Sequence, residues 1–117
     1  MQLIQGMAKR PEWEAYRAAL PVLGVDGTLA DVVKPDSPAR GKAFAKTGTN
    51  AWFDTLNGRP LLKSKTLAGA MTTASGREVL FALFVNDIPL DPGVNSDRVG
   101  KVLGNLCEIV YADEPVK

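Results

Sequence analysis

The chain has 117 residues, of which 45% are hydrophobic, and a formal net charge of +1 at neutral pH. This length suffices for one compact domain and is too short for two ordinary ones, so we expect a single unit over residues 1–117. Basic residues are interspersed with acidic ones instead of forming a stripe, which argues against nucleic acid or an anionic membrane surface as a partner.

One cysteine and no histidine are present. This excludes, within the chain, an internal disulfide, a Ser–His–Asp triad, a Cys–His dyad and zinc sites built on Cys and His. We therefore expect no metal and no cofactor, and any base would have to be a Lys, a Tyr or a carboxylate. Cys107 shares a helical pattern with Leu103, Leu106 and Val110, which favours a small core residue over a reactive thiol.

The chain offers no candidate membrane span. Its longest apolar run, residues 79–85, is far shorter than a bilayer requires, and residues 1–6 lack the apolar region of a signal peptide. Export, if it occurs, is expected to be directed by a segment upstream.

The first half of the chain predicts one short helix followed mostly by loop. Pro11 suits a first helical position, acidic residues follow it, and Pro21 ends the pattern, so we expect an amphipathic helix over residues 11–20. Glycines and prolines then break the chain, leaving room for one helical turn within residues 26–32. Residues 41–47 are expected to form the first strand, with Lys-Thr-Gly at its end.

The second half predicts a hairpin and a terminal helix. Residues 61–73 and 79–85 read as two strands joined by a turn at 74–76, and the unbroken apolar run of the second strand predicts helices on both faces of the sheet. After a loop over residues 86–95, Ser96 is expected to cap an amphipathic helix that reaches Val110. The predicted fold class is α+β: an antiparallel sheet of about three strands with a C-terminal helix packed on it.

The most informative stretch is Lys46-Thr47-Gly48-Thr49. An extended strand can pair with a peptide-like substrate, and a glycine lets that substrate approach closely. Lys46 supplies positive charge, the two threonine hydroxyls can donate to a carboxylate, and the N–H of Thr49 can face an oxyanion, a role worth about 3 kcal/mol per donor. Lys-Thr-Gly alone is a common tripeptide and is also typical of a plain turn after a strand.

A wider set of blocks gives the motif its context. They are Leu-Pro-Val-Leu-Gly-Val-Asp-Gly-Thr-Leu at 20–29, Ala-Lys-Thr-Gly-Thr at 45–49, Leu-Ala-Gly at 67–69 and Leu-Phe-Val-Asn at 83–86. Together they resemble the C-terminal portion of the class C low-molecular-mass penicillin-binding proteins, which are serine D-alanyl-D-alanine carboxypeptidases and endopeptidases of the bacterial cell wall. The resemblance extends from about Trp13 to Val110.

This resemblance implies a partial transpeptidase fold of the penicillin-binding-protein and β-lactamase type. It also implies that a serine attacks the D-Ala-D-Ala bond of peptidoglycan peptides, that β-lactams trap the same serine, and that the protein acts in the periplasm or elsewhere outside the cytoplasm.

The resemblance also assigns site residues. Lys46 matches the motif lysine and Thr49 the source of the oxyanion N–H, so both are candidate catalytic residues. Thr47, Gly48 and Thr49 match the substrate-binding positions, with the two hydroxyls on the carboxylate and Gly48 at the close approach. Trp52 is a candidate aromatic wall for the substrate's peptide stem, although packing against the sheet is the favoured alternative.

Two features depart from the family pattern. None of the four serines, Ser37, Ser64, Ser75 and Ser96, begins a Ser-x-x-Lys or a Ser-x-Asn, so this polypeptide is expected to be a piece of a longer enzyme that carries the nucleophile. Residues 50–61 exceed the short link expected in the family, and we expect them to form a loop that borders the substrate groove.

Three functional readings stay open. The chain is the C-terminal part of a serine DD-peptidase, inactive in isolation; or it is a stand-alone module that binds peptides or pairs strands without catalysis; or it has no function of its own. The third reading predicts self-association, because an unpaired strand edge and an apolar sheet face promote it.

Overall fold

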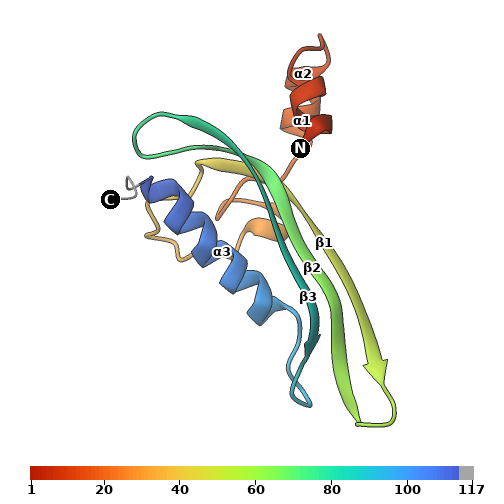
Figure 1. Cartoon of the computed structure of the whole chain (residues 1–117). Coiled ribbons are helices and arrows are strands. Elements are labelled where there is room, and N and C mark those ends of the chain that lie inside the picture. Colours follow the sequence, from red (N-terminus) through yellow and green to blue (C-terminus); the bar gives the residue numbers. More distant parts are fainter. Residues whose placement is uncertain (114–117) are drawn as a thin grey trace.

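The computed structural model describes residues 1–113 (Figure 1). The elements in chain order are α1 (Gln2–Met7), α2 (Trp13–Ala18), the single 3-10 turn η1 (Gly27–Leu29), β1 (Ala43–Asp54), β2 (Arg59–Thr72), β3 (Glu78–Pro89) and α3 (Asp97–Ala112). The three strands form one antiparallel sheet in the order β1-β2-β3, and α3 lies along it. The predicted α+β class and its C-terminal helix are confirmed.

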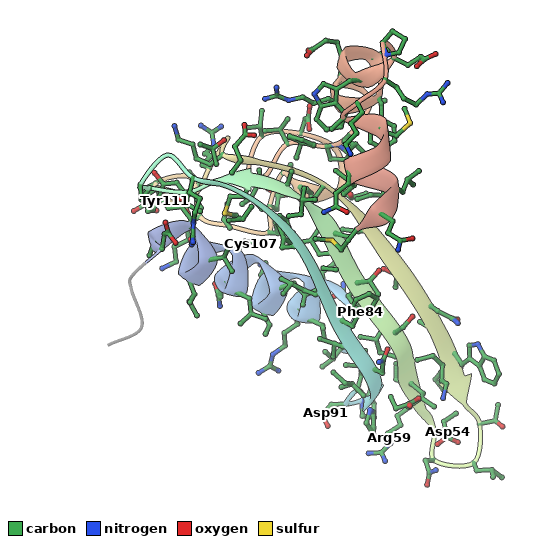
Figure 2. All side chains as sticks on the ribbon, turned by 45° about the horizontal axis from the view of Figure 1, so that its top comes forward. Asp54, Arg59, Phe84, Asp91, Cys107 and Tyr111 are labelled. Carbon is green, nitrogen blue, oxygen red and sulfur yellow. The ribbon has the colours of Figure 1, made fainter. Side chains whose placement is uncertain are left out.

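The core lies between α3 and the face of the sheet that it covers. Leu67 and Met71 from β2, Phe81 from β3, and Leu103 and Cys107 from α3 belong to one buried cluster. The predicted core position of Cys107 is confirmed (Figure 2). Burial, together with the nearby charge of Glu108, raises the pKa of the Cys107 thiol to about 11, so the thiol stays protonated at neutral pH.

Two glycines of α3 allow the helix to come close to the rest of the molecule. A Cβ on Gly104 would lie 2.0 Å from the carbonyl oxygen of Val32, so the 32–33 segment packs directly on the helix backbone. A Cβ on Gly100 would meet the Cε of Lys65 at 3.5 Å, an ordinary contact. Only Gly104 is therefore required by close packing.

Ser96 occupies the N-cap position of α3, as predicted, but its side chain makes no capping hydrogen bond. Its hydroxyl instead accepts a hydrogen bond of 3.3 Å from the Nζ of Lys65. Lys65 is buried, and this bond joins the middle of β2 to the start of the helix.

One prediction about the sheet holds only at one end. The apolar run at residues 79–85 suggested helices on both faces, but α3 covers one face, and α1 and α2 stand only at one end of the sheet (Figure 1). On the face opposite α3, the side chain of Phe84 is 67% exposed. In the described residues, the run therefore carries apolar surface that the chain itself leaves uncovered.

The N-terminal helices meet the sheet through Phe44. The ring of Trp13 packs edge-on against that of Phe44, with 5.7 Å between centroids, and the guanidinium of Arg17 lies 5.0 Å from the same ring. The predicted helix at residues 11–20 is present as the shorter α2, and η1 is the turn expected within 26–32. The sequence did not predict α1, a single short helix in which only Ile4 is buried.

Residues 50–61 do not form the predicted loop. β1 continues to Asp54 and β2 begins at Arg59, so most of this segment is an extension of the β1–β2 hairpin that projects beyond α3 (Figure 1). The carboxylate of Asp54 closes the turn by accepting hydrogen bonds from the side chain and backbone of Asn57 and from the backbone of Leu56. These bonds, the Asn57 side chain first, lower the pKa of Asp54.

The hairpin contains one irregularity. Asn50 pairs with Ser64 and Ala51 with Leu62, which leaves Lys63 as an extra residue in β2. Leu62 and Lys65 consequently both face α3, although they are three residues apart. Lys63 forms an ion pair with Asp87 of β3, whose φ of 54° marks the corresponding bend in that strand.

The end of α3 is fastened to the β2–β3 turn, which occupies the predicted residues. Asp113 accepts hydrogen bonds from the hydroxyls of Thr73 and Ser75 and pairs with Arg77, while the N–H of Ala74 donates to the carbonyl of Tyr111 at 2.8 Å. The hydrogen bond from Ser75, then that from Thr73 and the charge of Arg77, lower the pKa of Asp113.

This cluster predicts a pH-dependent contribution to stability. A carboxyl whose pKa is lower in the folded than in the unfolded state stabilises the fold fully above its ordinary pKa and loses that effect as pH falls through the lowered value. We therefore expect Asp113→Asn to lower the midpoint of thermal unfolding at pH 7, with a difference from wild type that shrinks toward pH 2. Thermal unfolding followed by circular dichroism at both pH values would test this, and an equal difference at both would contradict it.

No helix among residues 1–113 is long and apolar enough to cross a membrane.

Candidate functional site

The Lys46–Thr49 stretch lies in the middle of β1, not at the end of a strand as predicted. Lys46 pairs with Ala68 and Thr49 with Lys65, so the whole motif is held by β2 on one side. The alternative reading of Lys-Thr-Gly as a plain turn after a strand is therefore wrong.

The other edge of β1 is only partly covered. The N–H of Leu23 donates to the carbonyl of Ala43 at 2.9 Å, and the N–H of Ala45 donates to the carbonyl of Pro21 at 3.0 Å. Backbone groups alternate between the two edges of a strand, so those of Thr47 and Thr49 point to the same side as those of Ala43 and Ala45. In the described part of the chain, no segment pairs with β1 beyond Ala45, and these groups line an open edge.

Lys46 brings a positive charge to this edge. Its exposed side chain turns so that Nζ donates a 2.8 Å hydrogen bond to the carbonyl of Thr47. That carbonyl belongs to the open edge, so the ammonium group lies beside the backbone of the motif, where a carboxylate paired with β1 would meet it.

The Thr47 hydroxyl already has a protein partner. It donates a 3.1 Å hydrogen bond to the hydroxyl of Thr28, which belongs to η1. Thr28 was not predicted to be a site residue, although it belongs to the Gly-Val-Asp-Gly-Thr-Leu block that carried the resemblance. Only the fold brings these two threonines together, since 19 residues separate them along the chain.

Gly48 is also constrained from within the sheet. A Cβ at this position would lie 2.6 Å from the Oγ1 of Thr66, its partner on β2. The sheet therefore disfavours a larger residue independently of the substrate approach for which this glycine was singled out.

Trp52 lies on the same face of β1 as Lys46 and Gly48, because side chains alternate along a strand. Its side chain is 64% exposed, so the alternative that it packs against the sheet is wrong. The indole is available to a ligand at the continuation of the open edge.

Two other features do not contribute to this edge. Asp26 accepts a 2.7 Å hydrogen bond from the N–H of Val22, which makes it a turn residue. A hollow of about 1160 Å³ opens between α1, α2 and the Ala43 end of the sheet, but its lining excludes all four residues of the motif. Among residues 1–113, no three Cys, Asp or Glu side chains are grouped as a metal site.

Comparison with solved structures places this fold among the penicillin-binding proteins. The chain is similar to penicillin binding protein 4 from Haemophilus influenzae, with a TM-score of 0.65 and 25% identity over 94% of this chain and 23% of the other. A second structure of that protein, in complex with a β-lactam, matches with the same TM-score and identity and is covered to 24%. The chain thus spans about a quarter of the length of these structures.

The family follows from the sequence. The family model of D-Ala-D-Ala carboxypeptidase 3 (S13) matches residues 1–103, and the chain belongs to this family. No curated protein is similar enough in sequence to give a match.

Proposed function

We propose that the chain supplies the substrate-binding strand of a serine-type D-Ala-D-Ala carboxypeptidase or endopeptidase that acts on peptidoglycan peptides outside the cytoplasm. Residues 1–117 would be the C-terminal portion of its transpeptidase-like domain, without the Ser-x-x-Lys part, and inactive alone. The observation that carries this proposal is the open edge of β1, where the ammonium of Lys46 lies beside the outward backbone groups of Thr47 and Thr49.

In this proposal each motif residue has one role. Lys46 neutralises the terminal carboxylate of the peptide, and the hydroxyls of Thr47 and Thr49 donate to it, with Thr28 orienting Thr47. A serine from another part of the protein forms an ester with the carbonyl carbon of the penultimate D-alanine, and the terminal D-alanine leaves as its amine takes up a proton. The N–H of Thr49 stabilises the oxyanion of this step, and water then hydrolyses the ester.

The test is to label an extract of the source cells with a fluorescent penicillin, precipitate with an antibody against this segment, and read the size of the labelled band. A labelled band well above the 12.5 kDa of this chain is the expected result. An unlabelled band near 12.5 kDa would overturn the enzyme reading.

The same open edge supports a second candidate, a peptide-binding module without catalysis. That reading requires the pure 117-residue chain to bind a D-Ala-D-Ala peptide reversibly, and Lys46→Ala to abolish the binding. Self-association of the chain through its open edge or through the face that bears Phe84 stays a prediction. A monomer in sedimentation experiments at high concentration would contradict it.

A further inference from the structure

Lys65 is a buried charged residue with no role in the proposed function. Only 8% of its surface is exposed, and its side chain runs from β2 to the first turn of α3. A Cβ on Gly100 would lie 3.5 Å from its Cε and 3.8 Å from its Nζ. The same Nζ donates the 3.3 Å hydrogen bond to the hydroxyl of Ser96, the N-cap residue. The ammonium group therefore lies beside the start of the helix.

The charge of Lys65 has no counter-ion in the described residues. The ion pairs among residues 1–113 are Arg10–Glu12, Lys63–Asp87 and Arg77–Asp113. None of them includes Lys65, and its hydrogen-bond partner in this part of the chain, the Ser96 hydroxyl, is neutral. A buried charge is ordinarily paired, because burial without a partner raises the free energy of the charged group. An anion at this position would therefore stabilise the ammonium.

The start of α3 is also positive. Backbone N–H groups in the first turn of a helix have no partner within the helix, and the helix dipole places a partial positive charge there. In α3, which has 16 residues, the side chain of Ser96 does not cap these groups. The N–H groups of Arg98 and Val99 have no acceptor in the described residues. A helix start favours an anion, whereas here it meets the ammonium of Lys65, so two positive groups adjoin.

The side chains of the first turn define the ligand further. Arg98 is exposed and brings a second positive charge to the start of the helix, while Asp97 supplies one negative charge. The N–H of Asp97 is already used, since it donates to the side chain of Asn95 at 3.0 Å. The remaining donors come from different directions, with Nζ on the side of the sheet and the N–H groups at the helix end. Such donors suit a tetrahedral oxyanion better than a planar carboxylate.

We propose that the start of α3 binds a phosphate group, held by the side chains of Lys65 and Ser96 and by the N–H groups of the first turn. Those N–H groups belong to Arg98 and Val99, and the guanidinium of Arg98 adds a further positive charge. The site needs neither a serine nucleophile nor the open edge of β1, so it is independent of the proposed function. A free phosphate ion and a phosphate monoester share this chemistry, and the test distinguishes them.

The test is a titration of the ¹⁵N-labelled 117-residue chain with inorganic phosphate at constant ionic strength. The amide signals of Arg98 and Val99 are expected to shift to saturation with a Kd of about 1 mM, the affinity that about two charge-assisted hydrogen bonds give. At about 10 mM phosphate, the equilibrium constant for folding, measured by urea unfolding, should consequently rise about tenfold. No saturable shift at these two amides, or equal shifts at Lys42 and Lys46, would overturn the proposal.

Variants of Lys65 test its role directly. Lys65→Met removes the ammonium but keeps an apolar side chain of similar length, so the response to phosphate should disappear while the fold persists. Lys65→Arg should keep the response, because a guanidinium also binds phosphate. Lys63→Met is the matched control, since the ammonium of Lys63 pairs with Asp87 and its loss should leave phosphate binding as in wild type. Unchanged phosphate binding by Lys65→Met would contradict the proposal.

Ser96→Ala keeps the proposal testable if Lys65→Met does not fold. The Ser96 side chain makes no capping bond, so its removal should spare the helix and weaken phosphate binding about fivefold. Unchanged affinity in this variant would also contradict the proposal.

Two further ligands identify the source of the phosphate group. Glycerol 3-phosphate that binds as tightly as inorganic phosphate would support a site for a monoester on a larger molecule. Binding of inorganic phosphate alone would support a site for the free ion. Acetate, the planar comparison, should bind with about a tenth of the affinity or less. Equal binding of acetate and phosphate would overturn the assignment.

Discussion

In the enzyme of the proposed function, Lys46→Met is expected to reduce the rate of acylation by a fluorescent penicillin by about 100-fold or more. Removing the charged partner of a carboxylate that is held in a site costs about 3 kcal/mol, which corresponds to about 100-fold in rate. The exposed Lys46 side chain bonds only to the carbonyl of Thr47 in the described structure, so its loss should change the unfolding free energy by less than about 0.5 kcal/mol. Loss of acylation with an unchanged fold is therefore the specific signature.

The matched control is Lys42→Met. Lys42 is also exposed and lies just before β1, but its backbone, not its ammonium, bonds to the sheet through the N–H of Thr72. Acylation by Lys42→Met should equal that of wild type. If the two variants were equally active, or if both lost activity, the role of Lys46 at the open edge would be contradicted.

Gly104→Ala is expected to be the most destabilising single methyl that can be added to α3. The new Cβ would lie 2.0 Å from the carbonyl oxygen of Val32 and 3.3 Å from the Cγ1 of Val33. Since the obstacle is backbone, the helix must move away from the 32–33 segment, at a cost of about 2 kcal/mol or more. Urea unfolding would measure this as a lower midpoint with the same slope.

Gly100→Ala provides the comparison, one turn earlier on the same helix. Its Cβ would meet the flexible end of Lys65 at 3.5 Å and the Cγ1 of Val32 at 4.0 Å, which are ordinary contacts. The helix therefore gains the better propensity of alanine, about 1 kcal/mol, without a clash. The two substitutions should therefore move the unfolding midpoint in opposite directions. Equal destabilisation would mean that α3 tolerates no side chain at either position and that the close approach at Gly104 is not special.

The sequence predicted the parts of the fold that depend on local patterns. The helical spacing of apolar residues up to Val110 predicted α3, and the turn signal Ala74-Ser75-Gly76 predicted the β2–β3 hairpin. Residues 50–61 were misjudged because Gly58 and Pro60 resemble loop residues, whereas Gly58 closes a turn at a φ of 64° and Pro60 lies in β2. The coverage of residues 79–85 was misjudged because an apolar run does not reveal whether its covering partner lies in the same stretch of chain.

The candidate site likewise contains features that the sequence predicted and features that only the fold shows. Lys46 and the residues after it could be proposed from the motif alone, since the strand and the chemistry are both local. The contact between Thr47 and Thr28 could not, because it depends on how η1 meets β1. Ser96 was predicted only in part. Its position at the start of α3 was predictable, but its hydroxyl accepts a hydrogen bond from Lys65, 31 residues away, instead of capping the helix.

The single extra residue in β2 also governs how this hairpin can change in evolution. Deleting Lys63 would leave Leu62 two residues from Lys65, so both would still face α3 and the pairing of β1 with β2 would become regular, but Asp87 of β3 would lose its partner. Removing equal numbers of residues from both strands beside the 55–58 turn would shorten the hairpin with each remaining side chain on its present face. The reach of the open edge can therefore lengthen or contract across homologues while the core beneath α3 stays as it is.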